Sequence, residues 1–359
     1  MKKLRFGVVG VNTRGRDVMG EVIGKDCFEL CAICDIQPDI LEGAVRFFKE
    51  KGITNIDCYT DYAEMLKKAD IDAVFISTYA VCHVDFAIMA LEAGKHVLSE
   101  IPAVNSVEEA KRLKAAVKSF PKLKYMVAEN CCYWGHIQAW KEFAEQGKFG
   151  EIVYAESEYL HSRDFRSFKE DDYPKGHWRT HNSPIKYLTH NLGPLLHIME
   201  DECVSVSAMA PDAIYNPYLN VPRNAVALFK TKKGAVIRIL ISFGAYVNLD
   251  HNYRIIGTRG TIETDNVKGL KDAHSFARFS DIQGSIDKKI DIPVTISSFG
   301  EDGIHGGADR KMVLDFIDIV LNNKKVVLDV DFAVNISLPG IIAAESIDRG
   351  GELLEIPQI

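Results

Sequence analysis

Tyr187 and His190 stand three positions apart in the segment KYLTHNLGP, and their side chains are of types that carry acid-base chemistry. Residues three apart share one face of a helix, so a helix opening in this segment would present both together. An imidazole titrates near physiological pH and can take a proton from a hydroxyl group. We therefore predict His190 as a general base and Tyr187 as the residue that orients or acidifies it. The alternative is a purely structural His190.

A second candidate pair lies in the segment SEYLH, where Tyr159 and His161 are two positions apart. Successive side chains of a β-strand point to opposite faces, so residues two apart share a face. We predict that both side chains face the bound ligand and serve as further acid-base candidates. A structural role for each is the alternative.

The stretch from about residue 161 to residue 195 is dense in polar and aromatic side chains. Long loops in compact domains are usually functional or disordered, and the aromatic and histidine content argues against disorder. We predict that Arg163, Trp178 and Arg179 contact the substrate. Trp178 could stack on an apolar face of the ligand, and a core position is its alternative.

Two groups of residues have the spacing of metal ligands, and we predict a metal site at neither. His177 and His181 are four apart, as in helical zinc sites, but no third ligand is evident nearby. Cys27, Cys31 and Cys34 imitate an iron-sulfur motif, yet they flank and occupy an apolar run that is typical of a buried strand. On such a strand Cys31 and Cys34 would point to opposite faces and could not share a cluster.

The turn GVNTRG follows the first apolar run and resembles the dinucleotide fingerprint GxGxxG, with Asn12 in place of the middle glycine. Asparagine tolerates a left-handed backbone better than most residues, so the turn can persist. Asp35 lies 20 residues beyond Gly15, where a carboxylate binds the ribose hydroxyls of NAD and repels the extra phosphate of NADP. A doubly wound domain without a dinucleotide is the alternative. The predicted cofactor residues here are Gly10, Asn12, Thr13, Arg14, Gly15 and Asp35.

Elements that position these residues can be read from periodicity. Over residues 1–128, near-continuous apolar runs alternate with amphipathic stretches, which predicts an α/β fold with an N-terminal Rossmann-type, doubly wound parallel sheet. Over residues 129–359, short alternating strands joined by turn residues predict an α+β domain with an open, largely antiparallel sheet. Residues 306–350 are expected to return to helices.

Composition limits the classes of function. A chain of 359 residues is long enough for two domains. The net charge of −7, with scattered basic residues, argues against a nucleic-acid partner. No apolar run approaches the ~20 residues of a membrane span, and no disulfides are expected. We expect a cytoplasmic protein without a membrane partner.

Several longer motifs resemble the glucose-fructose oxidoreductase, inositol dehydrogenase and MocA (Gfo/Idh/MocA) family. They are GVVGVNTRGR, CDI, VFISTYAVCHVDFAIMALEAGKHVLSEIPA and HGGADRKMVLDFIDIV, and they extend along the chain. The resemblance implies NAD as the cofactor and a C-terminal sheet that serves in homo-oligomerisation. It also implies cofactor contacts from Ser77, Thr78, His83, Glu100, Pro102 and Asn130.

The departures from the family pattern are informative. Where the family has Glu-Lys-Pro, this chain has Glu100, Ile101 and Pro102. The lysine helps to polarise the hydroxyl that is oxidised, and an isoleucine cannot, so proton handling must pass to His190, Tyr187, Tyr133 or His161. With this change and the segments AENCCYWG, YLTHNLGP and HGGADRKM, the chain resembles the NAD-dependent glycosidase branch of the family, which is typified by α-N-acetylgalactosaminidase. That resemblance adds His305 to the predicted substrate residues.

We therefore expect an NAD-dependent oxidoreductase that acts on a sugar or glycoside by hydride transfer at a ring carbon, most directly C3. Oxidation followed by elimination would couple this step to glycoside cleavage. One alternative is a simple sugar or cyclitol dehydrogenase that releases NADH. Another is a non-catalytic NAD-binding sensor.

Overall fold

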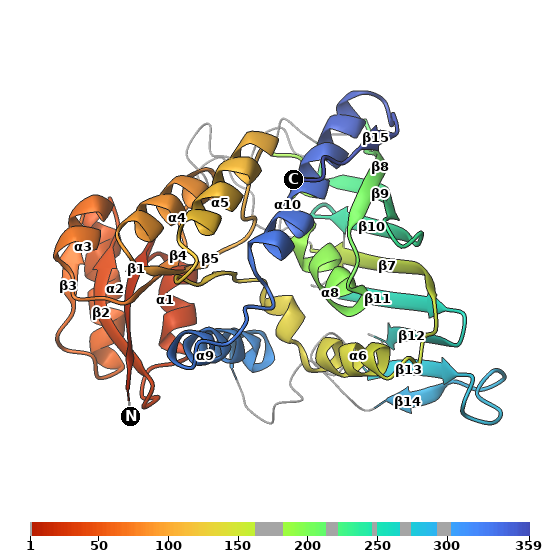
Figure 1. The fold of residues 1–359 in the computed structure, drawn as a ribbon, viewed down its shortest axis with the longest axis horizontal. Helices are drawn as coiled ribbons and strands as arrows, with labels where there is room; N and C mark the ends of the chain where they lie inside the picture. Colours follow the sequence, from red (N-terminus) through yellow and green to blue (C-terminus); the bar gives the residue numbers. More distant parts are fainter. Residues whose placement is uncertain (1, 162–181, 213–221, 246–249, 266–273, 293–302) are drawn as a thin grey trace. The chain divides into compact units, whose positions relative to one another are not determined.

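The computed structural model describes residues 2–161, 182–212, 222–245, 250–265, 274–292 and 303–359 (Figure 1). The chain divides into two compact units, and each is described by itself. The first contains Met1–Asn130, Asp302–Val334 and Ile359, and the second contains Cys131–Glu301 and Asn335–Gln358. The first division falls close to the expected boundary at residues 128/129. The expected division placed residues 302–334 in the second domain, whereas in the structure they belong to the first unit.

The first unit is built on a six-stranded sheet in the order β3-β2-β1-β4-β5-β6, and every neighbouring pair is parallel. This confirms the predicted doubly wound parallel sheet. All four side chains of Ala73–Ile76 are fully buried, as expected for a central strand covered on both faces. The strands are β1 (Leu4–Val9), β2 (Phe28–Cys34), β3 (Asp57–Tyr59), β4 (Ala73–Ile76), β5 (His96–Ser99) and β6 (Tyr125–Val127).

Helices that connect these strands begin at residues suited to capping. Asp61 accepts a hydrogen bond from Glu64 N at 2.7 Å, and Ser106 accepts one from Glu109 N at 3.0 Å. In a capping box Glu109 would accept from Ser106 N, but here it accepts from Asn105 N, one residue earlier. The helices of the first unit are α1 (Thr13–Gly20), α2 (Pro38–Glu50), α3 (Tyr62–Lys68), η1 (Ala80–Cys82), α4 (His83–Glu92), α5 (Val107–Ser119), η6 (Ile304–Gly307) and α9 (Ala308–Leu321).

The described part of the second unit holds a nine-stranded sheet in the order β14-β13-β12-β11-β7-β10-β9-β8-β15. Its neighbours are antiparallel except β7 and β10, which are parallel, so the predicted open, largely antiparallel sheet is confirmed. The strands are β7 (Ile152–Leu160), β8 (Cys203–Met209), β9 (Asn224–Thr231), β10 (Val236–Ser242), β11 (Asp250–Gly257), β12 (Gly260–Asp265), β13 (His274–Phe279), β14 (Ile290–Ile292) and β15 (Leu354–Glu355).

One face of this sheet packs against α6 (Gly135–Glu145) and α8 (Thr189–Met199) (Figure 1). Trp140 of α6 donates to Ser275 Oγ at 2.9 Å, and Asn191 of α8 donates to Ser157 Oγ at 2.7 Å. The short helices η2 (Asn130–Tyr133) and η4 (Pro184–Tyr187) precede α6 and α8. On β9 buried and exposed side chains alternate, and the exposed ones are Val226, Leu228 and Lys230.

The predicted helical return near the C-terminus is confirmed by α9 and α10 (Val330–Asp348), the latter beginning in the first unit and continuing in the second. Among the described residues, α10 alone is long and apolar enough to cross a membrane by length and composition, although we expected no apolar run of that length. Of its most apolar window, 61% is buried within the protein, as in the core helix of a globular protein.

Candidate functional site

The turn after β1 requires glycine at two of the predicted positions. Gly10 has φ +83°, and a Cβ atom there would lie 2.4 Å from the carbonyl oxygen of Ser77. A Cβ atom on Gly15 would lie 2.0 Å from the oxygen of Gly10. We expected a left-handed backbone at Asn12, but its backbone is extended. Its Oδ1 accepts from Thr13 N at 2.8 Å, so Asn12 is the N-cap of α1. The asparagine therefore preserves the turn by capping the helix.

Asp35 follows β2 and is held beside this turn. Its two carboxylate oxygens accept from Val11 N and Gln37 N, each at 3.1 Å, and its side chain is half-buried. A carboxylate has further lone pairs, so these bonds leave it able to accept from ribose hydroxyls. The turn without side chains at Gly10 and Gly15, the N-terminus of α1 and this carboxylate together fit a dinucleotide.

His83 is placed differently from its predicted role as a cofactor contact. Its Nδ1 lies 2.9 Å from the carbonyl oxygen of Pro102 and its Nε2 lies 3.1 Å from that of Thr78, and the residue is 1% exposed. Burial lowers the pKa of His83. The imidazole therefore ties the segment after β4, which contains Ser77 and Thr78, to the segment after β5, and both ring nitrogens face main-chain carbonyls.

Arg14 makes contacts within the first unit that its predicted cofactor role did not anticipate. Its Nε lies 2.7 Å from Glu100, and its two terminal nitrogens lie 2.9 and 2.8 Å from the two oxygens of Asp309. Burial alone would lower the pKa of Arg14, but the charges of Glu100 and Asp309 raise it. The guanidinium thus joins the dinucleotide turn to α9 and to the segment that follows β5, where Ile101 is also buried.

His305 and Asn130, which we predicted as substrate and cofactor residues, lie side by side in the first unit. The amide nitrogen of Asn130 is 3.2 Å from His305 Nδ1. The same imidazole nitrogen is 2.7 Å from Asp309 Oδ2, and the His305 side chain is 44% exposed.

Four of the predicted acid-base residues form a cluster of rings within the second unit. The ring of Tyr159 lies 5.6 Å from His161, 6.4 Å from Tyr187 and 6.0 Å from His190, measured between centroids. Tyr187 and His190 are 5.2 Å apart, although η4 holds the first and α8 the second. Segments that are separated along the chain are therefore brought together.

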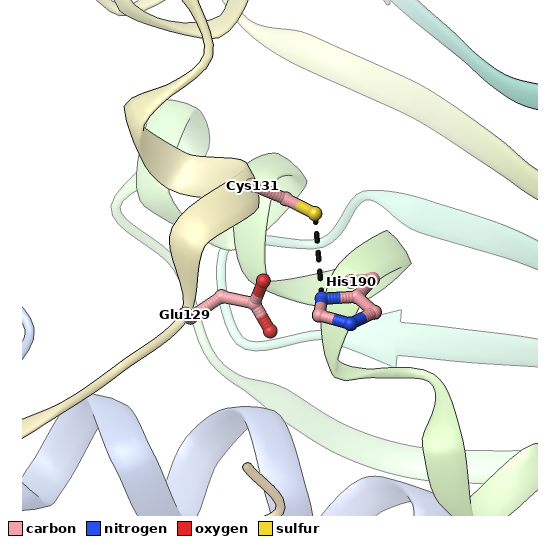
Figure 2. A group of neighbouring side chains, drawn as sticks. All are labelled: Glu129, Cys131 and His190. Carbon is pink, nitrogen blue, oxygen red and sulfur yellow. Dashed lines mark hydrogen bonds between the residues drawn. The ribbon is translucent and has the colours of Figure 1, made fainter. Parts of the chain in front are cut away.

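Two contacts hold His190 in this cluster. Its Nδ1 lies 3.3 Å from Sγ of Cys131, and its carbonyl oxygen accepts from the Tyr253 hydroxyl at 2.6 Å. Figure 2 shows the thiol directed at the imidazole, together with Glu129, which precedes Cys131 by two residues. Tyr133, a further candidate, is buried in the same short helix as Cys131.

Sequence reasoning missed three aromatic members of the cluster. His251 stacks on Tyr159 with centroids 4.0 Å apart, and Phe243 meets Tyr159 edge-on at 5.6 Å. Tyr253 lies two residues beyond His251 on β11, so both point to the same face. His251 is the partner of Tyr159 in the pairing of β11 with β7, and local periodicity does not specify which strands pair.

Some predicted residues cannot be placed. Arg163, Trp178 and Arg179, and the pair His177 and His181, lie outside the described residues.

Two family models match the chain. Residues 4–129 match the model described as "Oxidoreductase family, NAD-binding Rossmann fold" of the Gfo/Idh/MocA proteins. Residues 137–263 match the Gfo/Idh/MocA C-terminal domain.

Curated relatives and solved structures agree with these matches. The chain is 26% identical to "Alpha-N-acetylgalactosaminidase" of Tannerella forsythia, over 99% of this chain and 86% of that protein. It is also 26% identical to "Glycosyl hydrolase family 109 protein" of Shewanella pealeana, over 99% of this chain and 85% of that protein. Its fold is similar to that of a scyllo-inositol dehydrogenase from Lactobacillus casei solved with NAD(H) and scyllo-inositol, with TM-score 0.80, 19% identity and 99% of each chain covered.

Proposed function

Because this chain belongs to the Gfo/Idh/MocA oxidoreductase family, we propose that it is an NAD-dependent enzyme acting on a sugar or glycoside. The observation that carries the proposal is the cluster of Tyr159, Tyr187 and His190, which gathers acid-base groups in one place within the second unit. Such groups are needed when a hydroxyl is oxidised, since its proton must leave as the hydride leaves.

The first unit supplies the cofactor residues. Gly10 and Gly15 allow the close backbone packing that shapes the turn, and the N-terminus of α1 offers N–H groups to the pyrophosphate. Asp35 accepts from the ribose hydroxyls and disfavours NADP. When bound, NAD supplies the acceptor for a hydride from C3 of the sugar and its donor on return.

His190 accepts the proton of the hydroxyl that is oxidised, and Tyr187 orients its imidazole. Ile101 occupies the position of the lysine that serves related dehydrogenases, and an aliphatic side chain cannot exchange a proton. The work of that lysine therefore falls to the ring cluster. His305, with a partly exposed imidazole, contacts the sugar.

Cleavage of a glycosidic bond follows from the same chemistry. A ketone at C3 acidifies the proton on C2, and Tyr159 or His161 removes it as the bond from C1 to the leaving group breaks. Water then adds across the resulting double bond, C2 regains a proton, and reduction of the ketone restores the sugar. The names of the relatives from Tannerella forsythia and Shewanella pealeana support this redox-neutral outcome.

Deuterium exchange tests the proposal. The purified protein, supplied with NAD, is incubated in D₂O with a panel of α- and β-linked glycosides that includes N-acetylgalactosaminides. We expect free sugar deuterated at C2, without accumulation of NADH. Stoichiometric NADH without exchange at C2 contradicts cleavage and identifies a simple sugar or cyclitol dehydrogenase. NAD binding without turnover of any glycoside or free sugar contradicts both and leaves a sensor.

We also propose that the protein is a cytoplasmic homo-oligomer. All eight cysteines are free, which suits a reducing compartment.

The outer face of the second unit's sheet exposes Met209, Val226 and Leu228, and apolar groups gathered on a sheet face are typical of an interface. Light scattering after size-exclusion chromatography tests the assembly. A monomer in the unmodified protein contradicts it, and Leu228→Glu is expected to dissociate an oligomer.

A further inference from the structure

Asp309, at the second position of α9, is a buried carboxylate held between two side chains of the first unit. Its side chain is 0% exposed. Both of its oxygens accept from Arg14, and Oδ2 also lies 2.7 Å from His305 Nδ1. Burial alone would raise the pKa of Asp309, but the charge of Arg14 holds it well below its usual range. The carboxylate is therefore ionised at neutral pH.

An ionised carboxylate assigns the hydrogen on His305. Carboxylate oxygens can only accept, so the contact requires Nδ1 of His305 to carry the hydrogen. A neutral imidazole has one such hydrogen, which leaves a lone pair on Nε2. The amide nitrogen of Asn130 lies 3.2 Å from the same Nδ1, and an amide nitrogen cannot accept a hydrogen bond. The Nδ1–H form therefore requires the Asn130 amide to be turned by 180°, so that its oxygen faces Nδ1.

The backbone at His305 has a left-handed conformation, which is unfavourable for a residue with a side chain. His305, Gly306 and Gly307 have φ values of 52°, 66° and 80°, three left-handed residues in succession. A left-handed conformation is unfavourable for a residue with a side chain and persists where the surrounding structure imposes it. Here it coincides with the bond from His305 to Asp309, four residues further along the chain.

We propose that Asp309 is a positioning residue that fixes His305 in its Nδ1–H form and leaves Nε2 to accept a hydrogen bond from the sugar. Arg14 is the counter-ion of Asp309 and a brace within the protein, rather than a ligand of the cofactor phosphates. This assignment rests on the proposed function, in which His305 contacts the substrate.

The tautomer can be measured without any assay of turnover. Long-range proton–nitrogen NMR spectra of the ¹⁵N-labelled unmodified protein distinguish the two neutral forms of histidine, and His305→Ala assigns the signal by its loss. We expect the Nδ1–H form for His305. An Nε2–H form overturns the proposal, and this result does not depend on whether any variant of Asp309 folds.

A double-mutant cycle measures the consequence for activity. Asp309→Asn, His305→Ala and the double variant are compared with a competent substrate, and NAD affinity is measured separately. Partners that orient metal-binding histidines typically contribute roughly 10- to 100-fold, and we apply the same scale to His305. We expect Asp309→Asn to lower kcat/KM by about that factor in the parent and to have little further effect beside His305→Ala. Additive losses overturn the proposal, because they mean that Asp309 acts without His305.

Asp318→Asn is the matched control, since Asp318 is a hydrogen-bonded but more exposed carboxylate on the same helix. It is expected to leave kcat/KM unchanged. Full activity in His305→Ala shows that His305 has no role in turnover and overturns the positioning proposal. The proposed function then still stands, because the unmodified protein is active. Failure of the broader proposed function is recognised separately, by the absence of hydride chemistry in the unmodified protein.

Discussion

Sγ of Cys131 and Nδ1 of His190 lie 3.3 Å apart within the second unit, joining a short helix to the first turn of α8. Adjacent cysteines at 131 and 132 had no predicted role, and the contact gives the first of them one. A thiol near an imidazole nitrogen restricts the orientation of the ring, and so affects which nitrogen is available for proton transfer.

Cys131→Ala should therefore lower kcat by about two- to tenfold, the loss expected from one ordinary hydrogen bond of roughly 0.5–1.5 kcal/mol. Cys131→Ser retains a hydroxyl donor and acceptor and should recover part of the loss. Steady-state kinetics measure both variants. Cys203→Ala, which changes another buried cysteine of the second unit, serves as the control. Equal losses in all three variants would reduce the contact to a packing effect.

His190→Ala should remove most of the activity and leave NAD affinity intact, because general acid-base groups contribute on the order of 10²–10⁴-fold. Turnover and NAD titration are measured on the same preparation. His274→Ala is the comparison variant, since His274 is a partly exposed histidine of the same unit that contacts Asp291. Near-full turnover of His190→Ala returns this residue to a structural role.

Asp35→Ser should weaken NAD binding and relax the preference against NADP, because the carboxylate accepts from the ribose hydroxyls and repels a 2′-phosphate. Fluorescence titration with both cofactors measures the change. Asp39→Ser, on an exposed position of α2, should change neither affinity. Tighter binding of NADP than of NAD by the unmodified protein contradicts the assignment of Asp35.

His136 makes the stability of the second unit depend on pH. It is 2% exposed, neither ring nitrogen has a hydrogen-bond partner among the described residues, and burial lowers its pKa to about 3. An unfolded histidine has a pKa of about 6.5, so between these values the unfolded chain binds a proton that the folded chain does not. Stability therefore falls as pH decreases below about 6.5, by roughly 1.4 kcal/mol per pH unit from this residue.

His136→Phe should remove that dependence and raise stability at pH 5 by up to about 2 kcal/mol relative to the change at pH 7. The aromatic ring suits the neighbouring rings of Trp134, Trp140 and Tyr253. Urea unfolding at the two pH values measures the difference, with His274→Phe as the exposed control. An unchanged pH dependence in His136→Phe would show that other groups, such as His197, whose pKa burial lowers to about 4, dominate the acid response.

The sequence by itself determined the elements and the order in which they occur. Strand periods, turn glycines and helix caps act over a few residues, so the parallel sheet, the antiparallel sheet and the dinucleotide turn with Asp35 could be predicted locally. Tyr159, Tyr187 and His190 were named as candidates from local spacing and from the resemblance to a family, and the structure places their rings near one another. His251 was missed because it meets Tyr159 through the pairing of β11 with β7, which local periodicity does not specify.

Only the tertiary structure decided which distant side chains form ion pairs or hydrogen bonds. Arg14 and Asp309 are separated by 295 positions, and Cys131 and His190 by 59, so neither contact leaves a periodic signal in the sequence. Residues 302–334 belong to the first unit, so α9 lies in the same unit as Arg14. Arg14 there contacts the buried carboxylate of Asp309. Burying that carboxylate is costly unless a positive charge accompanies it, and this requirement settles the pairing once the fold has brought the two together.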